Sequence, residues 1–440
     1  LDEQAEEFGH RLPSVLPGGR TILYTVVRFS PNPNWTRSQI VALRLDSGER
    51  KVLIEGGSDG RYVESGHLVF AREGILMAVG FDPERLEVRG DPVPVLDGLV
   101  HSVYTHFGAR ETGAAQFGVS RDGLLVFGPG ETYPEEMFQL VWVNREGREE
   151  PLEIDPKWWS SGRISADGHQ ILLCRTYPPY QAYLYDLGRK TLRPQTFEGG
   201  TALAIWGPQE GEFTFGDAEG PQGIYIKSLD SGPGIREKLE TGFRAWHRPN
   251  SWTPDGRQLA FVSFTLESGF DIWLLDRQGH REPFLGTKFY EAYPEFSPDG
   301  KWLAYASNES GRSEVYVRPF PGPGKPVPIS TAGGEEPCWS RDQGEIFYAV
   351  ASSSNERAYW AVQITTKDGE LSAGLPKKLF EGTFARQQPY RGYDVAPDGR
   401  FLLRKLDPDS RSRIQQAMAP TRIELIQNWF EELSEKVPTE

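Results

Sequence analysis

The chain has 440 residues, of which 38% are apolar and 12% aromatic, so it contains enough apolar material for a large buried core. It carries 62 acidic residues against 48 Lys and Arg, which gives a net charge of −14. This acidic excess argues against a nucleic-acid backbone or an anionic membrane surface as the main partner, because both attract basic surfaces.

A tandem repeat organises the whole chain. Glycines recur at matched points about every 45 residues, at Gly19, Gly66, Gly123, Gly168, Gly211, Gly256, Gly300, Gly344 and Gly399. The sharpest copies, at 252–261, 296–305 and 395–403, each contain Pro-Asp-Gly followed by an apolar run. A period of this length predicts a solenoid, a propeller or an array, because one such unit cannot bury its own apolar faces.

Each repeat unit contains the signals for two hairpins. In Pro-Asp-Gly, proline presets φ, aspartate caps the turn, and glycine accepts the positive φ that reverses the chain. Runs such as 302–306 (Trp-Leu-Ala-Tyr-Ala) then alternate with the period of a half-buried strand. A second turn recurs roughly 20 residues later, around Gly48, Gly147, Gly188, Gly232 and Gly279. Two hairpins make four strands, so the sequence predicts an all-β protein, a β-propeller of four-stranded antiparallel blades.

Nine repeat units follow from these signals, at 11–56, 60–98, 105–154, 158–199, 202–241, 246–286, 291–331, 335–382 and 390–428. An N-terminal segment at 1–10 precedes them, and a C-terminal helix and tail at 429–440 follow. Nine units exceed the roughly four to eight blades that are usual in one ring. Two layouts therefore stay open: one large ring, or a six-bladed ring from units 4–9 (158–428) beside the remains of a second ring from units 1–3 (11–154).

The end of the chain departs from the repeat. After 422–426 the ninth unit has no outer-strand sequence of its own, so its fourth strand would have to come from the amino terminus or from sequence lost upstream of residue 1. Asn428 can cap a helix, and Glu431 three residues later completes a capping box. We therefore expect a short helix from Trp429 to about Lys436, which Pro438 ends.

The repeat resembles a known family. Copies of the form apolar-Ser-Pro-Asp-Gly-Lys-aromatic-Leu-Ala-Tyr, as at 296–305, are similar to the WD40-like (PD40) repeats of TolB-type bacterial β-propellers, and the likeness covers residues 11 to 428. Two segments, 62–96 and 428–433 (Asn-Trp-Phe-Glu-Glu-Leu), resemble the propeller region that follows the kinase domain in bacterial eukaryotic-like serine/threonine kinases. That resemblance implies a sensor or scaffold role, an extracytoplasmic or periplasmic location, and further repeats before residue 1.

Catalytic motifs are absent or incomplete in this sequence. Residues 56–60 (Gly-Gly-Ser-Asp-Gly) match the spelling of a nucleophile elbow, but a strand start follows where that motif needs a helix, so we interpret Ser58 as part of a plain turn. No glycine-rich kinase loop, catalytic His-Arg-Asp or Asp-Phe-Gly is present. The seven histidines show no metal-ligand spacing, and Cys174 and Cys338 fit two buried thiols better than a disulfide. We therefore expect no enzyme activity, no metal site and no cofactor in this chain.

The loops that lead into the first strand of each unit hold the candidate binding residues. In a propeller these connections gather on one face around the central channel. They are rich in side chains that are common in binding hot spots: Trp158, Trp159, Trp246, His247, Tyr290, Tyr293, Glu335, Glu336, Tyr390 and Arg391. Each of these side chains could instead pack between blades as core, so both interpretations stay open for any single residue.

The sequence thus favours a non-catalytic propeller that binds a protein, a peptide or a small-molecule ligand on its channel face, with no nucleic-acid partner. No stretch approaches about 18 consecutive apolar residues, so no membrane insertion is expected within this chain. Two alternatives stay open: the accessory propeller of a prolyl-oligopeptidase-like hydrolase, and a propeller that acts on polysaccharides. The first alternative needs an additional α/β-hydrolase domain.

Overall fold

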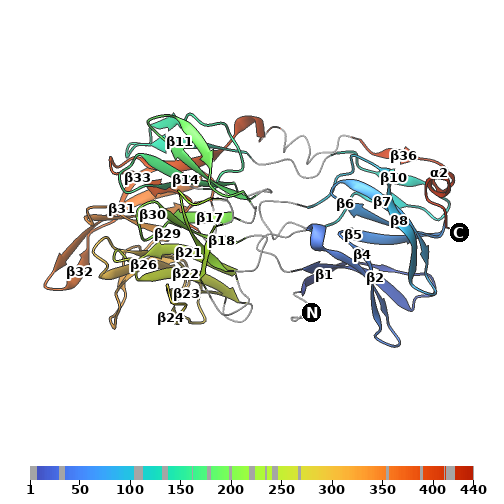
Figure 1. The fold of residues 1–440 in the computed structure, drawn as a ribbon, viewed down its shortest axis with the longest axis horizontal. Coiled ribbons are helices and arrows are strands. Elements are labelled where there is room, and N and C mark those ends of the chain that lie inside the picture. Colours follow the sequence, from blue (N-terminus) through green and yellow to red (C-terminus); the bar gives the residue numbers. More distant parts are fainter. Residues whose placement is uncertain are drawn as a thin grey trace. The chain divides into compact units, whose positions relative to one another are not determined.

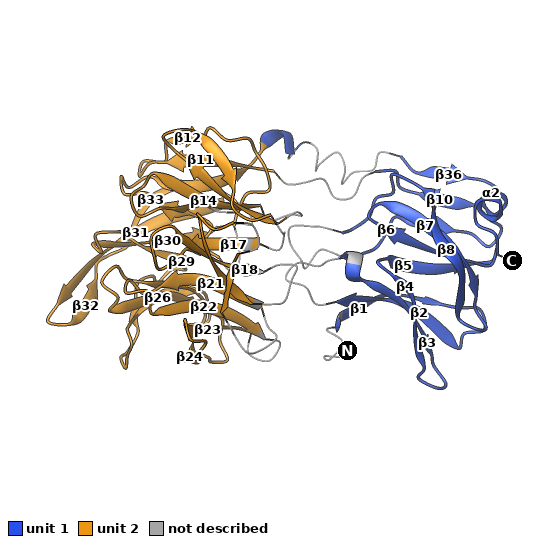
Figure 2. Ribbon diagram, in the orientation of Figure 1, with its two compact units in different colours: residues 1–136, 408–440 blue, residues 137–407 orange. Residues whose placement is uncertain are grey.

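The computed structural model describes residues 7–28, 35–103, 112–130, 137–160, 162–175, 180–197, 201–217, 223–232, 235–239, 246–265, 269–352, 356–386, 390–410, 412 and 422–439. Nearly all of the regular structure in these residues is β-strand, arranged as nine sheets (Figure 1). The chain divides into two compact units: unit 1 has residues 1–136 and 408–440, and unit 2 has residues 137–407 (Figure 2). The prediction of an all-β protein built from four-stranded antiparallel blades is confirmed.

Unit 2 contains six sheets. Five of them are each built from one continuous stretch of the chain. The first three consist of β13 (Arg163–Ile164), β14 (Gln170–Arg175), β15 (Gln181–Asp186) and β16 (Thr191–Pro194); β17 (Thr201–Trp206), β18 (Glu212–Asp217), β19 (Ile224–Ser228) and β20 (Glu237–Leu239); and β21 (Trp246–Trp252), β22 (Gln258–Thr265), β23 (Gly269–Asp276) and β24 (Arg281–Leu285). The fourth and fifth consist of β25 (Glu291–Phe296), β26 (Trp302–Ser307), β27 (Glu314–Pro319) and β28 (Val327–Pro328); and β29 (Glu335–Trp339), β30 (Glu345–Ala351), β31 (Glu356–Lys367) and β33 (Lys377–Thr383), with β32 (Glu370–Ala373) paired to the end of β31. The sixth sheet joins β34 (Asp394–Val395) and β35 (Phe401–Leu406) to β11 (Phe138–Val143) and β12 (Glu149–Pro151).

Buried apolar clusters show that these six sheets close into a ring. Each cluster combines side chains of two successive sheets, as Cys174 of β14 and Ala204 of β17 do. The clusters continue in this way from sheet to sheet. The last cluster joins Leu402 of β35 to Ile171 of β14 and so connects the sixth sheet to the first. Unit 2 is therefore a closed six-bladed propeller, in which each sheet buries both of its faces.

Unit 1 contains three sheets. They consist of β1 (Glu7–Val15), β2 (Thr21–Arg28), β3 (Gln39–Arg44) and β4 (Arg50–Glu55); β5 (Ser58–Val63), β6 (His67–Arg72), β7 (Ile75–Asp82) and β8 (Glu87–Leu96); and β9 (Phe117–Val119), β10 (Leu125–Phe127) and β36 (Glu424–Ile426). A short 3-10 helix, η1 (Trp35–Arg37), precedes β3. The third sheet has three strands, in the order β36-β10-β9.

Repeat units 3 and 9 exchange their outer halves. Repeat unit 3 contributes β9 and β10 to unit 1 but β11 and β12 to unit 2, and repeat unit 9 contributes β34 and β35 to unit 2 but β36 to unit 1. The β11–β35 pairing runs from Phe138↔Leu406 to Val143↔Phe401, and the β10–β36 pairing starts at Leu125↔Ile426. The prediction that the fourth strand comes from the amino terminus or from sequence lost before residue 1 is wrong, because β12 supplies it. The compact units accordingly divide between residues 136 and 137, whereas the sequence analysis placed the boundary at 154–158.

The Pro-Asp-Gly turns are held by a hydroxyl two residues before the aspartate. In the turn before β26, Ser297 Oγ donates to Asp299 Oδ1 at 2.7 Å and accepts from the Trp302 amide at 3.0 Å. Gly300 there has a φ of 70°. In the turn before β30, however, Gln343 takes this position with a φ of 61°, and Gly344 comes one residue later. The repeat glycine expected at Gly344 is therefore misplaced by one, because Asp342-Gln343 corresponds to Asp299-Gly300.

Side chains on the innermost strands bridge neighbouring blades. Backbone ladders run within each sheet, so contacts between sheets depend on side chains. The indole Nε1 of Trp252 donates to Thr214 Oγ1 at 2.9 Å, and that of Trp339 donates to the Glu295 carbonyl at 3.2 Å. Whereas these two tryptophans reach the preceding blade, Asp394 reaches the following one: its Oδ2 accepts from the Ile164 amide at 2.8 Å. These bonds satisfy buried polar groups and fix each blade to the next.

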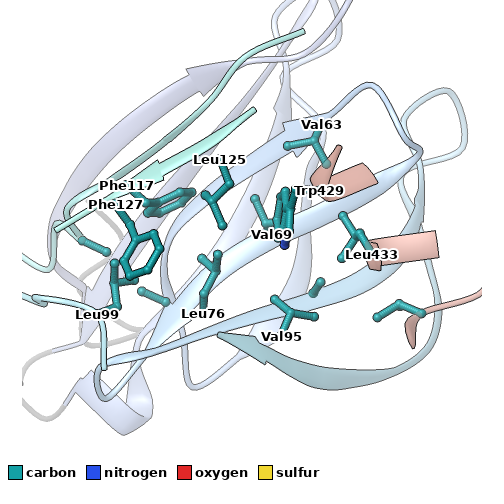
Figure 3. Close-up of a cluster of buried hydrophobic side chains, with 14 residues drawn as sticks. Val63, Val69, Leu76, Val95, Leu99, Phe117, Leu125, Phe127, Trp429 and Leu433 are labelled. Atoms are coloured by element: carbon teal, nitrogen blue, oxygen red, sulfur yellow. The ribbon is translucent and has the colours of Figure 1, made fainter. Parts of the chain in front are cut away.

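The C-terminal helix α2 (Trp429–Lys436) has the predicted bounds but not the predicted cap. Asn428 has a φ of 56°, in the left-handed region, and its side chain makes no capping hydrogen bond. The Trp429 amide instead donates to the Gly123 carbonyl at 2.9 Å. Trp429 and Leu433 point into the cluster between the second and third sheets of unit 1 (Figure 3). Tertiary packing therefore fixes this helix, and the expected capping box is wrong.

The two glycines of the turns before β26 and β30 should respond differently to alanine. Gly300→Ala puts a side chain at φ 70°, with its Cβ at 3.2 Å from Pro254 Cδ. We expect the free energy of unfolding to fall by about 1–2 kcal/mol, the usual penalty of the left-handed conformation. Gly344→Ala, the matched control, should cost less than about 0.5 kcal/mol because its φ is not positive. Urea unfolding measures both, and equal losses would contradict the assignment of the turn position to Gln343.

Turn aspartates should make the fold sensitive to acid. The hydroxyl bond lowers the pKa of the turn carboxyl at Asp122, Asp167, Asp255 and Asp342. A folded pKa below the unfolded value of about 3.9 means that the stabilisation is complete above that pH and is lost as pH falls through the folded pKa. Replacing all four aspartates with Asn should flatten the fall in Tm between about pH 5 and pH 2.5. The control variant replaces four exposed glutamates with Gln (Glu237, Glu282, Glu370 and Glu431), and an identical acid response of the two variants would contradict the role of the turns.

Candidate functional site

The residues proposed for binding lie where the innermost strands of unit 2 begin. Trp158 and Trp159 precede β13, Trp246 and His247 start β21, Tyr290 and Tyr293 lie at β25, Glu335 and Glu336 start β29, and Tyr390 and Arg391 precede β34. The strands thus place these residues at corresponding positions of five blades.

Most of these side chains are buried. Trp158, Trp159, His247, Tyr293, Glu336 and Tyr390 are each at most 5% exposed, whereas Tyr290, Glu335 and Arg391 are half-buried. The side chain of Trp246 lies outside the described part of the chain. Trp159 packs edge-on against Tyr183, with ring centroids 5.5 Å apart, and His247 packs similarly against Phe261. The buried members therefore serve as core in this state, and ligand contact by them stays a prediction.

Tyr390 and Arg391 make contacts across the unit 2 ring. The Arg248 guanidinium of β21 lies 5.4 Å from the Tyr390 ring centroid. Since the blades of β21 and β34 are three steps apart in either direction around the ring, this contact spans the channel. Arg391 forms ion pairs with Glu295 of β25 and, at 2.9 Å, with Asp394. Burial lowers the pKa of Arg391, and the Asp394 carboxylate opposes that effect.

A second ion pair lies fully inside the ring. Arg357 Nη1 is 2.8 Å from Glu336 Oε1, and neither side chain is more than 1% exposed. Glu336 Oε2 also accepts from the Gly392 amide of the next blade at 2.7 Å. Burial works against the charge of Arg357, but Glu336 outweighs it and raises the pKa of Arg357. Removing one partner of such a pair leaves an uncompensated buried charge, so we assign Glu336 a structural role.

Half-buried side chains form a patch beside the channel, which we call the rim patch and define as Phe264, Phe270, Tyr290, Glu335 and Arg386. Ring centroids lie 4.9 Å apart for Phe264 and Phe270 and 5.3 Å apart for Phe270 and Tyr290. Arg386 Nη2 donates to Glu335 Oε1 at 2.6 Å. Tyr290 lies within electrostatic range of both charged side chains. Burial raises the pKa of Glu335, while Arg386 opposes that effect.

The rim patch combines two residues that the sequence analysis named with three that it missed. Tyr290 and Glu335 belong to the loops before first strands. Phe264 lies near the end of β22 and Phe270 near the start of β23, and both lie at the same end of the sheet because Phe264 pairs with Trp246, the first residue of β21. The signal that could have identified them is the pair of aromatic residues on either side of the connection between the second and third strands of this repeat unit. Arg386 follows β33 and has no repeat-based signal.

Ser58 forms a buried polar cluster with His101 in unit 1. Ser58 Oγ lies 2.9 Å from His101 Nε2 and donates to the Gly113 carbonyl at 2.7 Å. The Gly74 amide donates to His101 Nδ1 at 3.2 Å, which puts the imidazole proton on Nε2. A general base for Ser58 would need a lone pair on that nitrogen. Burial lowers the pKa of His101 to about 4, and Ser58 is only 1% exposed, so this pair is a structural dyad.

Metal-binding and membrane-spanning features are not found among the residues described. Within them, no group of three or more His, Cys, Asp or Glu side chains could hold a metal ion. No helix in the same residues is long and apolar enough to cross a membrane. Cys174 and Cys338 are both buried free thiols, as predicted.

Comparison with known proteins identifies the fold. No family model matches the chain. A TolB-type protein from Agrobacterium tumefaciens superposes with a TM-score of 0.51 at 17% identity, over 62% of this chain and 99% of that one. The chain has the TolB-type β-propeller fold. TolB from Acinetobacter baumannii gives a TM-score of 0.40 at 14% identity, over 79% of each chain.

A curated protein resembles part of this chain in sequence. Dipeptidyl-peptidase 5 from Porphyromonas gingivalis is 25% identical over 181 residues, which cover 37% of this chain and 25% of that protein. The aligned segment thus spans about a quarter of the length of that relative.

Replacing Ser58 tests whether the dyad is structural. Ser58→Ala removes one bond to His101 and one to the Gly113 carbonyl, both buried, so the free energy of unfolding should fall by about 1–3 kcal/mol. Hydrolysis of p-nitrophenyl esters should be at background for both proteins. Turnover by the wild type that disappears in Ser58→Ala would establish Ser58 as a nucleophile instead.

Proposed function

We propose that this chain is a non-catalytic binding module whose rim patch on unit 2 holds a peptide segment of a partner protein. The observation that carries the proposal is the rim patch itself, in which several blades bring half-buried aromatic rings and an ion pair together. Of the other residues proposed for binding, Trp158, Trp159, His247, Tyr293, Glu336 and Tyr390 are buried.

The chemistry of the rim patch suits a peptide. Three aromatic rings in contact offer a rigid apolar surface at little cost in conformational entropy. Beside them, the Arg386 guanidinium can bind a carboxylate in a bidentate manner, and Glu335 can accept from a cationic side chain. The ligand that fits is therefore an apolar or aromatic side chain followed by a charged residue.

The contacts across the unit 2 ring favour a peptide at the rim over a small molecule in the centre. Tyr390 and Arg391 occupy the space between opposite blades and pair with Arg248, Glu295 and Asp394. A ligand in the channel would have to replace these contacts and leave buried charges unpaired, which costs several kcal/mol. The rim patch needs no such rearrangement.

Two resemblances support candidates for the wider role of the chain. The likeness of 62–96 and 428–433 to kinase-associated propellers supports a sensor or scaffold region of a bacterial serine/threonine kinase. The identity with part of dipeptidyl-peptidase 5 supports a second candidate, the accessory propeller of a peptidase. Both roles would use the rim patch to hold peptide, and the second requires a catalytic domain outside these residues.

Peptide selection tests the proposal. Peptides are selected from a random library on the wild-type chain, and their Kd is measured by calorimetry. Phe270→Ala removes the ring that contacts both Phe264 and Tyr290, so we expect a loss of about 2 kcal/mol, or roughly 30-fold in Kd. Leu375→Ala, at a residue 93% exposed in unit 2, is the control and should leave the Kd unchanged.

Two results would contradict the proposal. One is a library that yields no peptide with affinity for the wild-type chain. The other is a selected peptide whose Kd is the same for Phe270→Ala and the wild type, since its binding site would then lie elsewhere.

A further inference from the structure

The polar end of the rim patch offers a ligand more hydrogen-bond donors than acceptors. The Arg386 side chain is 29% exposed and the Glu335 side chain is 14% exposed. Both carboxylate oxygens of Glu335 already accept from Arg386. A ligand therefore reaches the donors of this ion pair more readily than its acceptors.

Two phenolic hydroxyls near the ion pair add further donors. The buried hydroxyl oxygens of Tyr290 and Tyr293 have no well-aligned hydrogen-bond partner among the described residues. Both tyrosines lie within electrostatic range of Glu335 and Arg386. Burial raises the pKa of Tyr290, and the Tyr293 hydroxyl, acting as a donor, opposes that effect. Even with this contact, the proton of Tyr290 still has no acceptor in the described part of the chain.

The backbone holds two of these donors in place. The Tyr290 amide donates to Asn308 Oδ1 at 2.9 Å, and the Tyr290 carbonyl accepts from the Asn308 amide at 3.3 Å. The Arg386 carbonyl accepts from Arg404 Nη2, on β35 of the next blade, at 2.6 Å. Because these residues are fixed before a ligand arrives, binding orders little of the protein.

We infer, on the basis of the proposed function, that the charged residue of the bound peptide is acidic and that Glu335 takes up a proton from solvent when that carboxylate binds beside Arg386. As a carboxylic acid, Glu335 donates its own O–H to the ligand, together with the donors of Arg386 and Tyr290. A lysine of the peptide would bring only further donors, and it would have to take Glu335 from Arg386.

The surroundings of Glu335 suit this uptake of a proton. The charged or titratable side chains near it in the described residues are Arg386 after β33, Glu336 on β29, Arg357 on β31, and Tyr290 and Tyr293 at β25. Burial raises the pKa of Glu335, Arg386 opposes that effect, and a ligand carboxylate would raise the pKa further, because two like charges disfavour each other. By linkage, the peptide should bind more tightly as the pH falls toward the pKa of Glu335 in the free protein, and its affinity should level off below that pKa.

Matched peptides test the inference. A peptide from the library selection is synthesised with Asp, Asn or Lys after its aromatic residue and titrated by calorimetry at about pH 7.5 and about pH 5.5, where the Asp stays ionised. At the higher pH the Asp peptide should bind about 10-fold more tightly than the Asn peptide, and the Lys peptide should bind most weakly. The Kd of the Asp peptide should fall several-fold at the lower pH. Its heat of binding should vary with the ionisation enthalpy of the buffer, because the protein takes up a proton.

Two variants locate that proton. Glu335→Gln supplies an amide donor that needs no proton, so at about pH 7.5 it should bind the Asp peptide about 10-fold more tightly than the wild type, without proton uptake. The control is Glu212→Gln, which breaks a similarly exposed ion pair with Arg277, at the other end of β23 from Phe270. This control should bind the Asp peptide like the wild type at both pH values.

The possible outcomes separate this inference from the proposed function. Selected peptides that prefer Lys or Asn to Asp would overturn the inference alone, since peptide binding at the rim patch would still hold. An Asp peptide that binds without proton uptake, or with an uptake that persists in Glu335→Gln, would overturn it in the same way. A library that yields no binder contradicts the proposed function and the inference together.

Discussion

Each sheet of unit 2 packs an apolar cluster against both of its faces, and the need to cover both faces determines the arrangement of that unit. A single four-stranded repeat cannot bury its own faces, so its stability depends on neighbours on either side. The shared clusters in unit 2 contain between seven and thirteen buried side chains each. Fully burying one large apolar side chain contributes about 1.5–3 kcal/mol before the cost of ordering the chain. A ring is the arrangement in which no sheet is left at an end.

Covering both faces also explains why the channel side of unit 2 is packed with side chains. The innermost strands lie closest to one another, so their polar groups must find partners across blades. Asp394 accepts from the Ile164 amide, and Glu336 from the Gly392 amide, each on the next blade. The same crowding buries Tyr390 and Tyr293. The side chains of the rim patch, by contrast, stay partly exposed.

The turns and hairpins of each repeat could be predicted from the sequence, whereas pairing between strands far apart in the chain could not. The repeat period and the turn residues identify four-stranded blades because each hairpin is encoded within about 20 residues. The exchange between repeat units 3 and 9 could not be predicted, since β11 and β35 pair across more than 250 residues with no local signal. Gln343 was missed because glycine one position later satisfies the same pattern. At the site, position along the strand was predictable, whereas burial depends on the neighbouring blade. Tyr290 and Glu335 therefore stay half-exposed while Tyr293 and Glu336, a few residues away, are buried.

The exchange of halves has a mechanical consequence. Both β1 and α2 belong to unit 1, and unit 2 is inserted between β10 and β36. A pulling force applied near residues 7 and 439 would first load the sheets of unit 1. It would reach unit 2 only after β36, held to β10 by a pairing of three residues, is peeled away. Unit 2 is thus protected from tension applied at these two residues until the pairing of β36 with β10 separates. The short β36 strand is therefore the element that must detach before unit 2 bears load.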